Sequence, residues 1–323
     1  MNRKEIGGYF ELELRDGKEY YDDAIKLNSG RNCFKYILLA QQPSKVYVPY
    51  YIDKSMKEES LIKLGIPFEF YHINKKLEIA KNIQVKNNEK ILYNNYFSLK
   101  GAYVKKLAKI YGQKLIVDNT QAFFERPIQG IDTLYSVGSK FFGVPSGGYL
   151  YTRILLDEKF KQSFSYNSVT HLIGRADKDA ASFFEYFQES KKKRNNQPIA
   201  LMSTLTKKIL SSIDYEKVRL IRERNFYYLH SYLKDVNELD VDFSMIKGPM
   251  VYPLLIKNES LRYELIKNKI YVATYWNEIL DLKGASKTEK YLAKYLLPLP
   301  IDQRYDLSDM DFIVKTIKKE VSI

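Results

Sequence analysis

Lys140 stands in a setting that differs from that of most lysines in this chain. It follows residues 133–137, a short run typical of a strand, and precedes the pair Gly147–Gly148. A lysine amine can attack a carbonyl carbon and form an imine when its surroundings lower its pKa. The alternative is an ordinary polar loop residue, and this segment alone does not decide between the two.

Asp118 is the second candidate for chemistry. It ends the apolar run 114–118, and Gln121 follows three residues later. A carboxylate at a buried strand end needs a partner, because an isolated buried charge is costly. A cationic ring nitrogen would be such a partner, whereas a capping role in the next turn is the alternative.

A third feature could bind an anion. Gly30 follows an Asn-Ser pair that indicates the start of a helix, and Arg31 and Asn32 add a charge and hydrogen-bond donors. Free backbone N–H groups and the helix dipole attract anions to such a start. Ser136 and Ser139, close to Lys140 in the chain, could donate to the same anion. A plain helix cap is the alternative.

Together these features match the needs of pyridoxal phosphate (PLP), which requires a phosphate site, an acidic partner for its ring nitrogen and a lysine for its aldehyde. They occur in the order anion-binding helix, Asp118, Lys140, and the last two are 22 positions apart. This order and spacing resemble the fold-type I PLP enzymes.

The elements that would position these residues alternate along the first half of the chain. We expect strands and helices in turn, which predict a mostly parallel sheet covered on both faces, with ligands at the carboxyl ends of its strands. After residue 152 the pattern becomes helical, and past residue 250 it is a small α+β pattern. We therefore predict a large α/β domain over residues 1–212 and a smaller C-terminal domain over 213–323. The expected strands are 45–51, 67–73, 89–97, 114–118, 133–137, 147–152 and 250–256, and the expected helices 33–40, 57–65, 99–112, 179–192, 199–211, 215–234, 259–269 and 307–321.

Composition sets the class of protein. A hydrophobic content of 45% with 28% charged residues is typical of a folded globular chain. No apolar run is long enough for a membrane span, and the first residues contain no apolar signal core, so we expect a cytoplasmic protein. Cys33 is the only cysteine, which excludes an intramolecular disulfide and a cysteine-based zinc site, and the three histidines are too scattered to suggest a metal site.

The net charge of +13 raises the question of an acidic partner. The lysines are spread along the chain, and no RNA-binding signature or zinc-finger spacing accompanies them. The sequence therefore does not favour nucleic acid, whereas an anionic small ligand such as a phosphate or a nucleotide fits the same charge.

Several segments, taken in order, resemble the DegT/DnrJ/StrS family of PLP-dependent sugar aminotransferases. "VDNTQAFF" is similar to the Asp-x-x-Gln/His segment of that family, and "YSVGSKFFGVPSGGYLY" to its segment from serine through lysine to Gly-Gly. "LNSGRNCFKYIL" occupies the place of its phosphate loop, and the helix over residues 214–233 is similar to its arginine-rich helix. The resemblance implies a three-layer PLP-dependent transferase fold with a smaller α+β C-terminal domain.

The resemblance also implies roles for individual residues. Lys140 would bind the aldehyde of PLP and then act as the base that moves protons. Asp118 would keep the pyridine nitrogen protonated, and Gln121 would hydrogen-bond the phenolic oxygen. Other cofactor contacts would come from Gly30, Arg31 and Asn32 with Ser136 or Ser139 at the phosphate, from Tyr50 or Tyr51 stacked on the ring, and from Asn195 reaching the phosphate of a neighbouring subunit in a homodimer.

The implied reaction transfers an amino group from an amino acid, with glutamate as the expected donor, to a keto-sugar carried on a nucleotide. Such reactions serve the biosynthesis of surface polysaccharides or of sugars in secondary metabolites. Two positions depart from the family pattern, because Arg31 stands in place of threonine and Gln197 in place of arginine. A dehydration reaction and a non-catalytic binding or regulatory role remain as alternatives. Family members that dehydrate sugars often have histidine at the lysine position, so Lys140 favours transamination.

Overall fold

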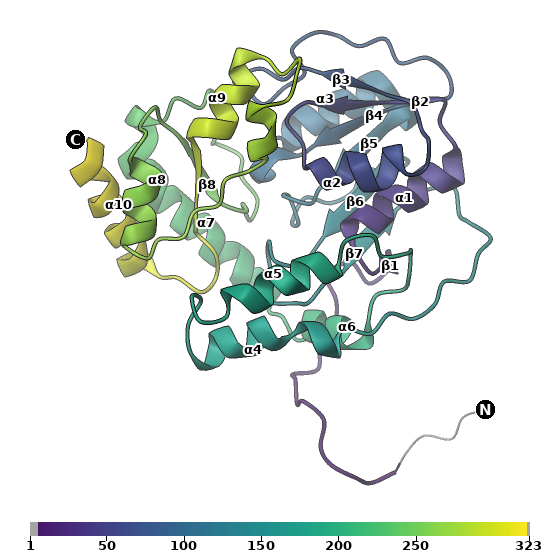
Figure 1. The fold of residues 1–323 in the computed structure, drawn as a ribbon, viewed down its shortest axis with the longest axis horizontal. Coiled ribbons are helices and arrows are strands. Elements are labelled where there is room, and N and C mark those ends of the chain that lie inside the picture. Colours follow the sequence, from purple (N-terminus) through teal and green to yellow (C-terminus); the bar gives the residue numbers. More distant parts are fainter. Residues whose placement is uncertain (1–5, 322–323) are drawn as a thin grey trace.

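A seven-stranded sheet forms the centre of the computed structural model, which describes residues 6–321 (Figure 1). The strand order is β1-β7-β6-β5-β4-β2-β3. The pairings from β6 to β3 are parallel, and both pairings of β7 are antiparallel. The strands of this sheet are β1 (Ile25–Leu27), β2 (Lys45–Pro49), β3 (Phe68–Tyr71), β4 (Glu89–Asn94), β5 (Leu115–Asp118), β6 (Asp132–Ser136) and β7 (Gly148–Tyr151).

Helices cover both faces of this sheet. Leu92 and Ile116 belong to the apolar cluster that contains the buried side of α1 (Gly30–Gln41). Tyr93 and Val117, their neighbours in the chain, belong to the cluster that contains the buried side of α3 (Gly101–Tyr111). Successive strand residues point to opposite faces, so the two clusters are the two sides of one sheet. The prediction of a three-layer α/β fold with a mostly parallel sheet is confirmed.

The remaining helices follow in chain order. No helix within residues 6–321 combines the length and the apolar character that crossing a membrane requires. The helices are α2 (Lys54–Met56), which continues into the π-helix η1 (Lys57–Ile62), α4 (Thr170–Asp177), α5 (Phe184–Lys193), α6 (Thr204–Ser211), α7 (Tyr215–Leu233), α8 (Leu261–Lys267), α9 (Lys287–Tyr295) and α10 (Leu307–Val321).

The C-terminal part contains a second, two-stranded antiparallel sheet of β8 (Tyr252–Leu255) and β9 (Leu296–Leu299). The helices α7, α8, α9 and α10 lie around it (Figure 1). The predicted boundary at residues 212 and 213 falls in the short connection between α6 and α7. The division into two domains stays a prediction, because buried side chains of both parts belong to one apolar cluster.

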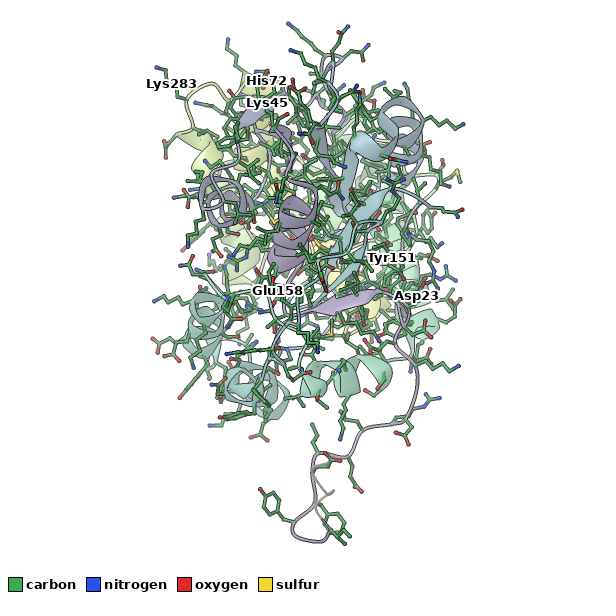
Figure 2. The ribbon with its side chains drawn as sticks, turned by 90° about the vertical axis from the view of Figure 1, so that its right-hand side faces the viewer. Asp23, Lys45, His72, Tyr151, Glu158 and Lys283 are labelled. Atoms are coloured by element: carbon green, nitrogen blue, oxygen red, sulfur yellow. The ribbon has the colours of Figure 1, made fainter. Side chains whose placement is uncertain are left out.

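The segment before β1 is held on the sheet by tyrosine hydroxyl groups. Tyr151, at the end of β7, lies beside Asp23 (Figure 2) and donates to its carboxylate. Tyr149 donates to Glu19. Tyr21 is fully buried, and its hydroxyl group donates to the carbonyl oxygen of Glu125 at 2.9 Å. The bond from Tyr21 ties this segment to the loop after β5, seven positions beyond Asp118.

Candidate active site

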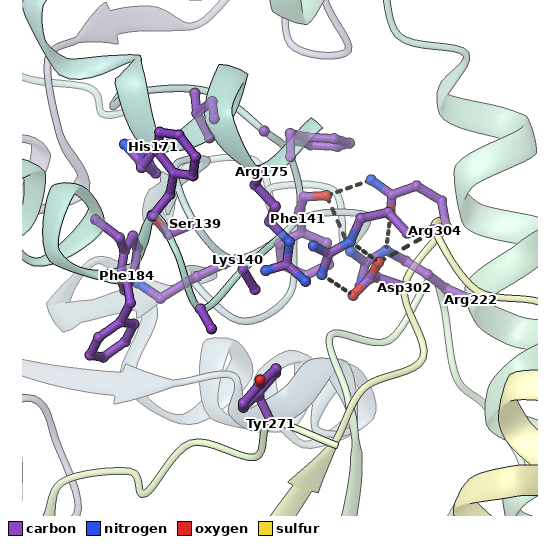
Figure 3. A pocket seen from close by; sticks show the side chains of 18 residues that line it. Ser139, Lys140, Phe141, His171, Arg175, Phe184, Arg222, Tyr271, Asp302 and Arg304 are labelled. Atoms are coloured by element: carbon purple, nitrogen blue, oxygen red, sulfur yellow. Dashed lines mark hydrogen bonds and ion pairs between the residues drawn. The ribbon is translucent and has the colours of Figure 1, made fainter. Parts of the chain in front are cut away.

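Lys140 lies in a turn directly after β6, at the carboxyl end of a central strand. Its side chain lines a pocket of about 610 Å³ (Figure 3). Lys140 is an exposed residue, yet the protein atoms around its amine lower its pKa by desolvation, an effect that the nearby carboxylates of Asp53 and Asp118 oppose. Lys140 therefore faces an open cavity and holds a neutral, nucleophilic amine at a lower pH than an ordinary lysine does.

Asp118 ends β5, the strand next to β6, and only 6% of its surface is exposed. Its carboxylate accepts a hydrogen bond from the backbone N–H of Thr120 at 2.7 Å. Desolvation by burial raises its pKa. Within residues 6–321, no lysine, arginine or histidine side chain forms an ion pair with it. A buried carboxylate without a paired cation fits the protonated ring nitrogen of PLP, whose positive charge would compensate it.

The start of α1 lies against the same edge of the sheet. Ser29 caps the helix by accepting from the backbone N–H of Asn32 at 3.2 Å. A Cβ atom on Gly30 would lie 2.7 Å from the Cβ atom of Ser136, and one on Gly148 would lie 2.8 Å from the backbone nitrogen of Gly30. Both positions therefore require glycine, because a side chain would push the helix start away from the ends of β6 and β7. The structure thus brings Gly30 and Ser136 together, as the sequence predicted for an anion site.

The side chains of Arg31 and Asn32, the next two residues, contact different parts of the protein. Arg31 forms an ion pair with Glu59 and donates to the Oδ1 atom of Asn195 at 3.1 Å. The amide nitrogen of Asn32 donates to Asn28 at 2.7 Å and to the carbonyl oxygen of Pro198 at 2.8 Å. Both the backbone N–H and the amide of Asn32 are therefore engaged within the protein, and its predicted phosphate contact stays a prediction.

Ser139 and Asn195 approach the helix start from two other segments. The hydroxyl group of Ser139 accepts from the guanidinium of Arg194 at 3.3 Å. Asn195, next in the chain, lies beside Arg31 of its own chain. The loop after α5 thus reaches the first turn of α1 in its own chain, and the predicted contact of Asn195 with a neighbouring subunit stays a prediction.

Gln121, Tyr50 and Tyr51 lie outside the lining of the Lys140 pocket. The side-chain oxygen of Gln121 accepts from the backbone N–H of Phe97 at 3.1 Å. Tyr50 stacks on Phe70, with ring centroids 4.4 Å apart, and lines a separate pocket of about 210 Å³. Tyr51 is fully buried, and its hydroxyl group is unpartnered among the described residues. Neither tyrosine lines the pocket of Lys140, so the structure does not choose the aromatic ring that would stack on PLP.

The wall of the Lys140 pocket consists largely of residues that the sequence analysis did not identify. They are mainly phenylalanines and arginines from four separate parts of the chain, and Figure 3 shows several of them around Lys140. The pair Phe141–Phe142 directly after Lys140 and the run "FFEYF" at residues 183–187 were visible signals, but nothing local showed that they face the same space. The main members are Phe141, Phe142, Phe183, Phe184, Phe187, Arg175, Arg222 and Arg304.

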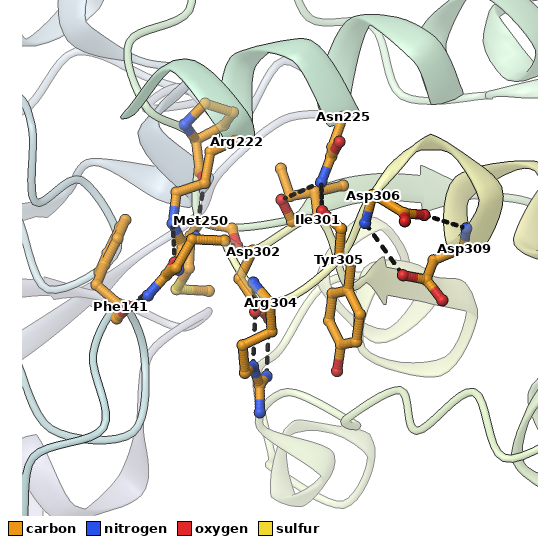
Figure 4. Close-up of polar contacts among 12 residues, drawn as sticks. Phe141, Arg222, Asn225, Met250, Ile301, Asp302, Arg304, Tyr305, Asp306 and Asp309 are labelled. Atoms are coloured by element: carbon orange, nitrogen blue, oxygen red, sulfur yellow. Dashed lines mark hydrogen bonds and ion pairs between the residues drawn. The ribbon is translucent and has the colours of Figure 1, made fainter. Parts of the chain in front are cut away.

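Arg222 connects the Lys140 turn to the C-terminal part. Its guanidinium donates to the carbonyl oxygens of Phe141, Pro249 and Met250, each at 3.1 Å (Figure 4). Gln303 also donates to the carbonyl oxygen of Phe141, at 2.9 Å. Desolvation by burial lowers the pKa of Arg222 to about 10. Arg222 therefore holds the residue after Lys140 in place and is fully engaged in doing so.

Comparison with known proteins supports the fold. No family model matches the chain, and no curated protein matches it. Among solved structures, a DegT/DnrJ/EryC1/StrS aminotransferase from Brucella abortus is 16% identical, with 92% of this chain and 85% of that one covered and a TM-score of 0.61.

Two further structures are similar. The aminotransferase TlmJ from Streptoalloteichus hindustanus is 13% identical over 93% of this chain and 86% of its own, with a TM-score of 0.65. PseC from Helicobacter pylori is an aminotransferase involved in the biosynthesis of pseudoaminic acid. It is 13% identical over 93% of this chain and 87% of its own, with a TM-score of 0.61. At these identities the likeness shows the fold, which is the one that the motifs predicted.

Proposed function

We propose that this protein is a PLP-dependent aminotransferase of the DegT/DnrJ/StrS type, which transfers an amino group from an amino acid to a keto-sugar carried on a nucleotide. One observation carries the proposal. Three features lie together where the strands of the sheet end. They are Lys140 with its lowered pKa, the buried carboxylate of Asp118 without a paired cation, and the start of α1, which packs closely at Gly30. PLP has one group for each of them.

Bound PLP would supply an aldehyde that takes up the amino group and a ring that withdraws electrons. Lys140 would hold the aldehyde and then, as a free amine, move a proton at the carbon that carries the amino group. Asp118 would keep the ring nitrogen protonated, because a negative carboxylate stabilises the positive charge of the ring. That positive charge would in turn offset the desolvation that raises the pKa of Asp118. The backbone N–H groups at the start of α1, together with Ser136 and Arg31, would bind the phosphate.

The pocket beyond Lys140 supports a large anionic substrate. Its phenylalanine rings offer apolar faces, and Arg175 adds a guanidinium for which residues 6–321 provide no carboxylate partner within ion-pair distance. Rings together with cations suit a base and a diphosphate. DesI, another structure of this fold, was solved in the presence of its TDP-sugar product. We propose a nucleotide-linked keto-sugar as substrate, with glutamate as the donor.

A homodimer and a cytoplasmic location are further parts of the proposal. Two-fold dimers are the commonest symmetric assemblies of soluble proteins, and Asn195 lies on a loop that borders the anion site. The single cysteine, Cys33, is buried, so the chain needs no oxidising compartment. Sedimentation at micromolar concentration should give a dimer, and a monomer that binds PLP at full strength would contradict this part.

The test of the proposed activity uses the purified protein, PLP, glutamate and a panel of nucleotide keto-sugars. We expect glutamate alone to convert bound PLP to pyridoxamine phosphate with release of 2-oxoglutarate, and one keto-sugar to be aminated. Conversion of a sugar with loss of water instead would show a dehydration reaction. PLP binding without any turnover across the panel would favour the non-catalytic role.

A further inference from the structure

Arg31, in the first turn of α1, and Arg194, beside the turn of Lys140, bring two guanidinium groups close together, and only one of them has a carboxylate partner. Arg31 is paired with Glu59. Arg194 donates to the Ser139 hydroxyl group at 3.3 Å and to the carbonyl oxygen of Pro145 at 2.9 Å, which are both neutral acceptors. Within the described chain, residues 6–321, no aspartate or glutamate forms an ion pair with Arg194.

The surroundings of Arg194 make this charge costly. Desolvation by burial lowers its pKa, and the positive charge of Arg31 lowers it further. The two arginines are adjacent, because Arg31 also donates to the carbonyl oxygen of Arg194 at 3.4 Å. The carboxylate of Glu59 is paired with Arg31, so Arg194 has no compensating negative charge of its own, and an anion would supply it.

The position of Arg194 places this charge next to the cofactor-binding turn. Its Nη1 atom lies within hydrogen-bond reach of Ser139, the residue directly before Lys140. A Cβ atom on Gly138 would lie 3.5 Å from the same Nη1 atom, so the guanidinium packs along the turn itself. A structural role is the competing explanation, since the bond to Pro145 also ties the loop after α5 to the loop before β7.

We propose that Arg194 binds the phosphate group of PLP, so that each chain contributes a guanidinium to its own phosphate site. This inference rests on the proposed function and assigns a role to a residue that the sequence analysis did not identify. A guanidinium binds phosphate through two parallel hydrogen bonds, which are stronger than bonds between neutral groups. The bond to the Ser139 hydroxyl group would hold the guanidinium in place for this contact.

The experiment compares Arg194→Gln with Arg153→Gln in the full-length apoprotein. Arg153 is exposed and lies after β7, so its variant controls for the loss of one positive charge. Each protein is titrated with PLP and with pyridoxal, which lacks the phosphate, and its melting temperature is measured with and without inorganic phosphate. We expect Arg194→Gln to weaken PLP binding by about tenfold or more, which corresponds to about 1.4 kcal/mol, to leave pyridoxal binding unchanged and to reduce the stabilisation by phosphate.

The other outcomes are equally informative. If PLP binding in Arg194→Gln equals that in Arg153→Gln, Arg194 does not bind the phosphate. If PLP and pyridoxal binding weaken by the same factor, Arg194 serves the structure of the loop, and the inference is wrong. If the wild-type protein binds neither PLP nor pyridoxal, the proposed function fails; phosphate stabilisation that depends on Arg194 would then still support the anion site, and its absence would overturn that as well.

Discussion

The two sides of Lys140 are built in different ways. On one side is the sheet edge, where strand ends, a helix start and close-packed glycines meet outside the pocket lining. Its polar groups are held by short hydrogen bonds such as that from Thr120 to Asp118. On the other side is the pocket wall, here called the aromatic wall, which combines Phe183, Phe184, Phe187 and Tyr271 with arginines and comes from α4, α5, α7 and loops of the C-terminal part (Figure 3). One side chain there, Phe184, is 55% exposed.

This difference separates two tasks. The sheet edge has fixed geometry, which chemistry on a cofactor requires, because small displacements of reacting groups are costly. The aromatic wall has apolar surface that binding of a substrate would cover. We therefore expect substitutions at the sheet edge to reduce turnover and substitutions in the aromatic wall to change substrate affinity.

The largest effect should come from Lys140→Ala. Removal of the amine removes both the cofactor attachment and the base, so we expect activity to fall by about 10³-fold or more. Borohydride reduction of the wild-type protein with PLP, followed by peptide mapping, should place the pyridoxyl group on Lys140. Lys192→Ala, at an exposed lysine of α5, is the control and should keep both label and activity. A label on another lysine would contradict the proposal.

Asp118→Asn should reduce turnover by about 10²-fold, because an amide cannot keep the ring nitrogen protonated. The side chain keeps its size, so the variant should still fold and be labelled at Lys140. Steady-state rates with glutamate measure the first effect, and thermal unfolding measures the second. Full activity in this variant would show that Asp118 has a structural role only.

Phe184→Ala tests the aromatic wall. We expect the KM for the nucleotide sugar to rise by about tenfold, while kcat changes little and Lys140 is labelled as before. Tyr186→Ala is the matched control, because Tyr186 is a partly exposed aromatic residue of the same helix outside the pocket lining. A fall in kcat with an unchanged KM would show that the aromatic wall takes part in chemistry.

The smallest effect should be the pH dependence of apoprotein stability. Burial raises the folded pKa of Asp118 above its ordinary value of 3.8, so its stabilising contribution is present at low pH and lost as pH rises through the folded pKa. The Asp118→Asn variant cannot ionise at this position, so it does not lose this stability as the pH rises. It should melt a few degrees above wild-type apoprotein at neutral pH and at the same temperature at pH 4. Each kcal/mol of unfolding free energy corresponds to roughly 2–4 °C in melting temperature. Added PLP should reduce the difference. Equal pH profiles would show that the burial of Asp118 costs nothing.

The amino-acid sequence by itself determined the sheet edge. Asp118, Lys140 and the start of α1 could be identified because strand ends, helix caps and glycine pairs are local features of the chain. The same kind of signal could have found α9, where Ser286 and Glu289 form a capping box, but we did not predict that helix. The three-residue strand β1 offered too short a pattern to be recognised.

Only the tertiary structure decided which distant residues complete the site. Asn32, whose predicted phosphate contact stays a prediction, donates to Pro198, 166 positions later in the chain, and Arg194 reaches Ser139 across 55 positions. The aromatic wall likewise depends on how α5 and the C-terminal part pack against the turn of Lys140. Such contacts result from packing between segments that are remote in sequence, and local residue patterns carry no information about which segments meet.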